Sequence, residues 1–289
     1  MAPFTIPELT LYPLVNSKNY PPDPTDQNVG VWRDVKGKIF ALTQVIESEY
    51  WIHWQDLASF CLQINHNRIQ AYVLPEIDAN IVHDIFQRSI LPYHLQLSGY
   101  EVLHASSIRK NKSVIAFCAV SGMGKSTLAY ALSFWGNELW SDDALVIETF
   151  PTPPSVFKIP FYIRLLPDAY DFFVDETTNN RFPNKKPFSN STLSQNHANE
   201  AELSTIIFIE RIKELEKNST IQLEPILPTE AYPLIVKNAY VFENEDKNRK
   251  KQMLENYLDL VSKINIYKLQ YPSELYKLSD LIIAIDKLI

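Results

Sequence analysis

Seven consecutive residues near the middle of the chain have the types and spacing of a phosphate-binding loop: Ser121, Gly122, Met123, Gly124, Lys125, Ser126 and Thr127. They follow an apolar run at residues 114–120, and Ala119 stands where the pattern G-x-x-x-x-G-K-[ST] has its first glycine. Glycine lets successive backbone N–H groups surround an anion, while the lysine reaches the β and γ phosphates and the Ser126 hydroxyl coordinates Mg²⁺. The motif predicts nucleotide binding; the alternative is a tight strand-to-helix turn that happens to contain lysine and serine.

Two adjacent aspartates, Asp142 and Asp143, follow the loop at the end of a second apolar segment. A carboxylate at this place can hold Mg²⁺, and a kinase that acts on an alcohol also needs a carboxylate to accept the hydroxyl proton. Two neighbouring aspartates can divide these tasks. Standing alone, the pair also fits a turn or a helix cap.

A histidine, His104, lies on the apolar segment before the loop strand. Such a histidine is commonly a core residue that is hydrogen-bonded to its neighbours. If residues 102–108 pair with residues 113–120 as a hairpin around residues 109–112, His104 lies near the mouth of the loop. There it could orient an aspartate or contact a transferred phosphate.

The elements around these residues alternate between strand and helix. Strands are predicted at residues 102–108, 113–120 and 138–148, with a helix at 125–135 between the last two. Further along, the pattern predicts a strand at 205–210, a helix from near Thr229, a helix within 246–264, a strand at 266–269 and a closing helix at 273–288. This order indicates an α/β fold.

The first hundred residues have a different pattern. Residues 1–30 hold six of the 19 prolines and predict an extended arm. Short strands at 39–45, 49–54, 60–64 and 69–74 predict a small antiparallel sheet, followed by a helix at 78–97 with Asp78 as its cap and Pro92 as a kink. A β-rich N-terminal subdomain at 31–100 and a core at 101–289 are therefore expected.

A long polar stretch at residues 174–199 interrupts this core and carries Arg181, Lys185 and Lys186. A segment of this length is either disordered or a lid that closes over a reacting group. Lys185 and Lys186 are then candidates for contacting phosphate, or ordinary solvated charges.

The composition and net charge of the chain limit its expected partners and location. A net charge of −7 argues against a nucleic-acid partner, and the sequence has neither an apolar run long enough to span a membrane nor a signal peptide. A cytoplasmic protein without a membrane partner is expected. The two cysteines, Cys61 and Cys118, lie in apolar segments and are predicted to pack as small hydrophobic residues.

Taken in order, Leu103-His104, a strand, Gly-x-Gly-Lys-Ser, a helix and Asp-Asp resemble the HPr serine kinase/phosphorylase family. The closer resemblance is to HPr-kinase-related proteins of peptide-modifying pathways, including lasso-peptide kinases. These relatives also have a run like Arg164-Leu165-Leu166-Pro167-Asp168-Ala169. The resemblance covers about residues 30–289, and its specific part is residues 102–143.

The resemblance implies a phosphoenolpyruvate-carboxykinase-like P-loop kinase core with a small β-rich N-terminal part, and ATP and Mg²⁺ as cofactors. Lys125 would neutralise the transferred phosphate, Ser126 and Asp142 would hold the metal, Asp143 would be the general base, and His104 would assist it. Arg164 would be a further catalytic residue.

The family's second signature, Glu-Ile-Arg-Gly, corresponds here to Tyr162-Ile163-Arg164-Leu165. Tyr162 replaces the acidic metal ligand and Leu165 replaces the glycine, so the resemblance does not extend to phosphorolysis or to regulated hexamer formation. Whether these occur, and whether the protein forms a homo-oligomer, stays an open question.

Three functions are compatible with these residues. The first is a Mg-ATP-dependent kinase that phosphorylates a Ser or Thr hydroxyl of a peptide or small protein. The second is a kinase of a small-molecule hydroxyl, and the third is an ATP-responsive binding module without transfer activity. Retention of both aspartates favours a kinase, because a module that only binds needs no base.

Overall fold

Strands and helices are divided between two parts of the chain, which together make a mixed α/β fold as predicted. The computed structural model describes residues 4–14, 21–24, 30–34, 36–150, 152–178, 200–212, 221–240, 247–272 and 278–287. Residues 1–100 with 241–251 form a first compact unit, and residues 101–240 with 252–289 form a second. The functional division into arm, subdomain and kinase core stays a prediction.

The first unit contains a six-stranded sheet with strand order β1-β6-β5-β4-β3-β2. Its elements are β1 (Glu8–Pro13), β2 (Gly30–Arg33), β3 (Ile39–Ile46), β4 (Glu49–Trp54), β5 (Ala58–Gln63), the 3₁₀ turn η1 (Ile64–His66) and β6 (Arg68–Val73). The four predicted strands are confirmed as β3 to β6, and each pairs antiparallel with the next.

Strand β1 comes from the predicted extended arm and pairs in parallel with β6 at one edge of this sheet. An edge strand is held largely by main-chain hydrogen bonds. It therefore needs no hydrophobic periodicity from which a sequence could reveal it.

The helix predicted after this sheet has three parts: α1 (Ala79–Ile85), the π-helical turn η2 (Phe86–Ile90) and α2 (Leu91–Leu97). Asp78 caps α1 as expected, because its carboxylate accepts a hydrogen bond from the Asn80 N–H at 2.8 Å. Pro92 lies in the first turn of α2, directly after η2. Proline has no N–H to donate along a helix, so the wider turn lies where the regular hydrogen-bond pattern is interrupted.

The second unit contains a larger sheet with strand order β10-β8-β9-β13-β12-β11-β7, in which β15 pairs with β13 and β14. Its strands are β7 (Glu101–Leu103), β8 (Ala105–Lys110), β9 (Ser113–Cys118), β10 (Glu138–Ser141), β11 (Leu145–Glu148), β12 (Ser155–Phe157), β13 (Glu200–Ile212), β14 (Gln222–Pro225) and β15 (Asn265–Pro272). Strand β8 pairs antiparallel with β9, which confirms the predicted hairpin.

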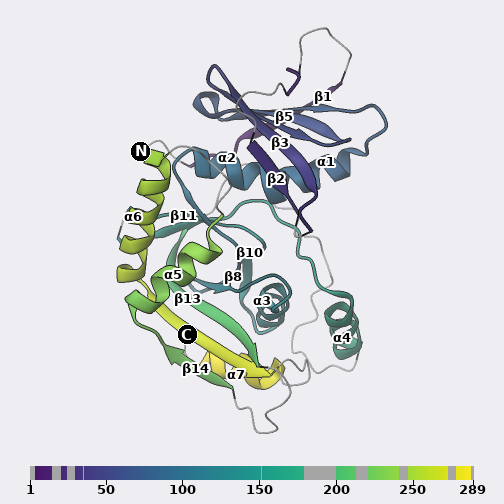
Figure 1. The fold of residues 1–289 in the computed structure, drawn as a ribbon. Coiled ribbons are helices and arrows are strands. Elements are labelled where there is room, and N and C mark those ends of the chain that lie inside the picture. Colours follow the sequence, from purple (N-terminus) through teal and green to yellow (C-terminus); the bar gives the residue numbers. More distant parts are fainter. Residues whose placement is uncertain are drawn as a thin grey trace. The chain divides into compact units, whose positions relative to one another are not determined.

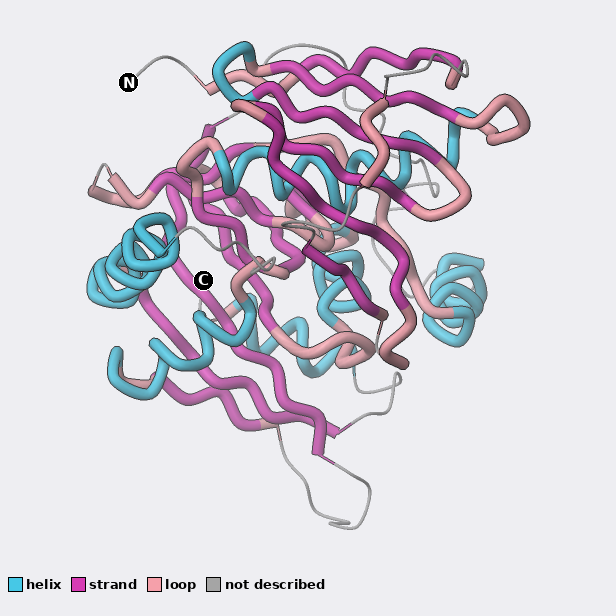
Figure 2. The backbone as a smooth tube through the Cα atoms, turned by 45° about the horizontal axis from the view of Figure 1, so that its top comes forward, coloured by secondary structure: helices cyan, strands magenta, loops and turns pink. Residues whose placement is uncertain are grey.

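Helices cover both faces of this sheet (Figures 1 and 2). They are α3 (Lys125–Ser133), α5 (Pro228–Asn238), α6 (Lys247–Lys263) and α7 (Leu278–Asp286), while α4 (Pro167–Thr178) packs through Phe173 against Tyr130 and Phe134, in and directly after α3. Val114, Ala116 and Cys118 of β9 pack in a cluster with α5 and α6, whereas Ile115 and Phe117 pack in a cluster with α3 and α7. A strand buried on both faces explains why the sequence before the loop is almost continuously apolar.

Three neighbouring strands of the sheet, β9, β13 and β15, run in parallel. Phe208 lies opposite Cys118, and Arg211 lies opposite Tyr271, so the carboxyl ends of the three strands meet at one edge. The loop at residues 119–124 leaves β9 at this edge. In open α/β sheets, ligands bind at the carboxyl ends of such strands.

The predicted strands at 102–108 and 138–148 are each broken, and this corrects the expectation of two uninterrupted strands. Strand β7 pairs with β11, and β8 pairs with β10. Leu103 lies opposite Leu145 and Ser107 opposite Ser141 in the same register, which shifts by one residue between Ser141 and Leu139. Between these two pairs, residues 104–106 and 142–144 do not pair with one another, although Ala105 and Ser106 still pair with β9 on the other side. Asp143 has a left-handed backbone with φ 64°, which does not fit a strand.

The later predicted elements are confirmed as β13, α5, α6, β15 and α7. Residues 273–277 and 288 of the predicted closing helix lie outside the described residues. So does the predicted lid at 174–199 with Arg181, Lys185 and Lys186, apart from residues 174–178, which end α4. Cys61 and Cys118 are buried and not bridged, as predicted. None of the described helices is long and apolar enough to cross a bilayer.

Candidate active site

The loop between β9 and α3 has the backbone of a tight turn around its glycines. Gly122 and Gly124 have φ values of 81° and 93°, in the left-handed region that only glycine enters without strain. Gly124 is the N-cap of α3, and its carbonyl accepts the Leu128 N–H at 2.9 Å. Residues 121 and 122 are exposed, so one side of the turn faces solvent.

Lys125 begins α3, and its side chain folds back into the loop. Its Nζ donates to the carbonyl oxygen of Ala119 at 2.9 Å and to Nε2 of His104 at 3.2 Å. Burial lowers the pKa of this ammonium group, and interactions with Cys118, Asp143 and Asp142 oppose that shift. The lysine is thus a largely enclosed cation beside the two aspartates.

His104 occupies the break between β7 and β8 and connects the lysine to Asp143. Its Nδ1 lies 3.0 Å from the main-chain carbonyl oxygen of Asp143. A carbonyl oxygen only accepts, so the hydrogen-bond network assigns the proton to Nδ1 and leaves Nε2 to accept from Lys125. The histidine was expected to orient an aspartate, and the structure brings it to Asp143 through the main chain.

Asp142 is a buried carboxylate that accepts hydrogen bonds from three elements. Its Oδ1 accepts the hydroxyls of Ser106 at 2.5 Å and Ser126 at 2.7 Å, and its Oδ2 accepts the Arg164 N–H at 3.3 Å. Burial raises the pKa of Asp142, the neighbouring Asp143 raises it further, and the three hydrogen bonds oppose the shift. The predicted pair of Ser126 and Asp142 is therefore brought into direct contact.

Asp143 is half-buried and next to this carboxylate. Its charge contributes to the pKa shifts of both Lys125 and Asp142, so the carboxylate lies within electrostatic reach of both. With its left-handed backbone, Asp143 directs its carbonyl oxygen toward His104.

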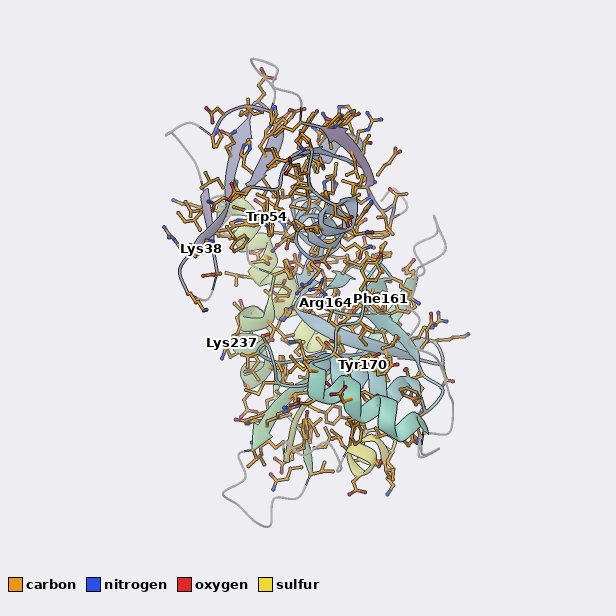
Figure 3. The ribbon with its side chains drawn as sticks, turned by 90° about the vertical axis from the view of Figure 1, so that its right-hand side faces the viewer. Lys38, Trp54, Phe161, Arg164, Tyr170 and Lys237 are labelled. Carbon is orange, nitrogen blue, oxygen red and sulfur yellow. The ribbon has the colours of Figure 1, made fainter. Side chains whose placement is uncertain are left out.

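Arg164 lies on the segment before α4, where Figure 3 labels it together with Phe161 and with Tyr170 on α4. Its side chain is exposed, and the contact with Asp142 comes from its main-chain N–H. The segment is thus joined to the aspartate, while a catalytic role of the guanidinium stays a prediction.

Three residues of this region were not predicted as site residues. Ser106 is fully buried and shares the Asp142 oxygen with Ser126, with the two hydroxyl oxygens 3.4 Å apart. The sequence held a signal for it, because Ser106 follows His104 by two residues and so shares one face of the predicted strand 102–108 with it. Arg211 and Tyr271 lie beside Gly124, and only the pairing of distant strands brings them there.

The oxygen donors fit a magnesium ion held jointly with phosphate. Among the residues that the structure describes, no cluster of three or more His, Cys, Asp or Glu side chains could bind a metal by itself. Mg²⁺ bound with a nucleotide typically takes one or two carboxylates, with phosphate and water oxygens completing its shell. Asp142 and the Ser126 hydroxyl supply two adjacent oxygens of this kind.

Comparisons with known proteins add little to this geometry. No family model matches the sequence, and no curated protein matches it. Among solved structures, the chain is similar to the Hpr(Ser) kinase/phosphatase from Coxiella burnetii, with 15% identity over 65% of this chain and 87% of that chain and a TM-score of 0.32. Identity and TM-score this low do not establish a family or an activity.

The two loop glycines predict different costs of substitution. Gly122→Ala adds a Cβ into open space and should cost only the left-handed strain, about 1–2 kcal/mol. In Gly124→Ala, the Cβ would also lie 2.7 Å from Nη2 of Arg211 and 2.8 Å from the Tyr271 hydroxyl. We expect the free energy of unfolding, measured with urea, to fall by about 1 kcal/mol more in Gly124→Ala than in Gly122→Ala, because neighbouring atoms must move. Equal losses would contradict the packing described here.

The raised pKa of Asp142 predicts the pH dependence of stability. The folded state binds this proton more tightly than the unfolded chain, so the contribution of Asp142 becomes destabilising as the pH rises from the unfolded value of about 3.9 through the raised folded value. Asp142→Asn removes this titration. We expect the variant to have a higher Tm than the wild type at neutral pH, with the gap closing toward acid pH.

Thermal unfolding followed by circular dichroism at several pH values checks this expectation. Glu224→Gln, on the exposed surface of β14, removes one carboxylate without touching the site and should show no such gap. A Tm difference between Asp142→Asn and wild type that widens as the pH falls would contradict a raised pKa of Asp142 in the folded state.

Proposed function

We propose that this protein is a Mg-ATP-dependent kinase that transfers the γ-phosphoryl group to a Ser or Thr hydroxyl of a peptide or small protein. The observation that carries the proposal is the 2.7 Å hydrogen bond between Ser126 and Asp142, formed where a glycine turn opens a helix that begins with a lysine. A strand-to-helix turn without a ligand has no need of a buried carboxylate that faces a hydroxyl and an ammonium group.

The loop provides the phosphate site in this proposal. Backbone N–H groups around Gly122 and Gly124, together with the positive end of α3, would bind phosphate oxygens. Lys125 would exchange its contact with the Ala119 carbonyl for a phosphate oxygen. Mg²⁺, held by Ser126 and Asp142, would neutralise charge on the phosphate oxygens.

Asp143 is the proposed general base. The acceptor oxygen attacks the γ-phosphorus, its proton passes to the Asp143 carboxylate, and the bond between the γ-phosphorus and the bridging oxygen breaks as ADP leaves. His104 holds the main chain of Asp143 on one side and Lys125 on the other. His104 would thereby keep Asp143 and Lys125 in a fixed arrangement while negative charge moves from the acceptor oxygen to the leaving phosphate.

The arrangement is of the HPr-kinase-like type, including the lasso-peptide kinases, and the fold would be the phosphoenolpyruvate-carboxykinase-like P-loop fold. The resemblance of residues 102–143 supports this, because the structure brings together the loop, His104 and the two aspartates that carry it. A peptide acceptor in the cytoplasm, where ATP and Mg²⁺ are available, is part of the same proposal.

Replacement of Asp143 by asparagine tests the proposal. Asp143→Asn keeps the size of the side chain but removes the proton acceptor, so phosphorylation of the acceptor should fall by about 10²–10⁴-fold while ATP still binds. The measurement is mass spectrometry of candidate peptides incubated with protein, ATP and Mg²⁺, alongside calorimetric titration of ATP. Glu224→Gln serves as the control and should phosphorylate as the wild type does.

The acceptor class is decided in the same assay. Phosphate on a small-molecule hydroxyl but on no peptide would assign the second type of kinase. Tight ATP binding without transfer to any acceptor would indicate a binding module, and unchanged turnover in Asp143→Asn would remove that residue as the base.

A further inference from the structure

A cation outside the sequence motif lies beside the loop. Arg211, near the end of β13, and Tyr271, near the end of β15, are directly opposite each other in the parallel pair. Both reach Gly124, the last loop residue before α3: a Cβ on Gly124 would lie 2.7 Å from Nη2 of Arg211 and 2.8 Å from the Tyr271 hydroxyl. The absence of a side chain at Gly124 is therefore what lets these two groups approach the loop.

Tyr271 fixes the position of the guanidinium. Its hydroxyl donates to the carbonyl oxygen of Met123 at 3.2 Å and accepts from Nε of Arg211 at 3.4 Å. The centre of the guanidinium lies 5.9 Å from the centre of the Tyr271 ring, within the range of a cation–π contact. Arg211 is thus held against the loop by a neutral residue.

Within the part of the chain that the structure describes, Arg211 makes no ion pair. The adjacent Glu210 is paired with Lys268 at 2.6 Å and accepts from Gln270 at 2.7 Å, and alternation along β13 directs it to the opposite face of the sheet. A half-buried guanidinium beside the positive end of α3 is unfavourable by itself. A bound anion at the loop would remove this cost.

We propose that Arg211 is a second phosphate-contacting residue of this site, whose guanidinium binds oxygens of the nucleotide's phosphate chain from the β13 side of the loop. The inference rests on the proposed nucleotide function. Lys125 contacts the loop from the side of Ala119 and His104, whereas Arg211 approaches at Gly124. Planar guanidinium groups bind phosphate oxygens in a bidentate manner and add geometric selectivity to charge.

Binding of ATP and ADP to Arg211→Met, Arg211→Lys and Lys268→Met tests this role. Arg211→Met keeps an apolar stem against Tyr271 and removes the charge, so we expect it to weaken ATP binding by about tenfold or more. Arg211→Lys should recover part of the loss, and the dependence of ATP affinity on NaCl should be weaker in Arg211→Met than in the wild type. Lys268→Met removes a cation from the neighbouring strand and should bind ATP within about twofold of the wild type, because its charge faces away from the loop.

Thermal unfolding without nucleotide separates this role from a purely structural one. We expect the Tm of Arg211→Met to stay close to that of the wild type, since the variant loses the weak contacts with Tyr271 but no ion pair among the described residues. If the wild type binds ATP and Arg211→Met binds it with the same affinity, the role of Arg211 is overturned while the proposed function stands. A lowered Tm with no rescue by lysine and no change in salt dependence would likewise overturn it, in favour of a structural role. A wild type that binds no nucleotide would instead overturn the proposed function, and this inference with it.

Discussion

The buried carboxylate of Asp142 is the constraint on which the rest of the candidate site depends. A charged group that is almost completely removed from water is tolerated only with hydrogen bonds to its oxygens. Three elements far apart in the sequence supply them: β8 through Ser106, the start of α3 through Ser126, and the segment before α4 through the Arg164 N–H. Asp142 therefore connects the loop helix, the neighbouring strand and the segment before α4.

This constraint also explains the break in the two-stranded ribbon. If the pairing of β7 with β11 continued without a break into that of β8 with β10, residues 104–106 and 142–144 would pair with one another. Instead, the left-handed backbone of Asp143 directs its carbonyl to His104, and the imidazole reaches Lys125 on its other side. The interruption of the pairing thus lets the Asp143 carbonyl, the His104 imidazole and the Lys125 ammonium group form one hydrogen-bonded chain.

The local part of this arrangement could be predicted from the sequence. Alternation and apolar runs gave the strands β3 to β6 and β9, and the glycines before Lys125 gave the turn into α3. Ser126, Asp142 and His104 were identified because each follows a strand or opens a helix in an order that is typical of one chemistry. The break at Asp143 could not be predicted, because the segment is apolar on both sides and a left-handed aspartate has no periodic signal. Arg211 was missed since its place depends on the register between β13 and β15, which are more than fifty residues apart in the chain.

The central claim is that Ser126 and Asp142 hold a magnesium ion together with the phosphates of ATP, and its most direct test is calorimetric titration of ATP with Mg²⁺ and with EDTA. The wild type should bind ATP more tightly with Mg²⁺, and Ser126→Ala should lose most of that difference, because one of the two oxygen ligands is gone. Equal ATP affinity of the wild type in Mg²⁺ and EDTA, or a full magnesium effect in Ser126→Ala, would contradict the account.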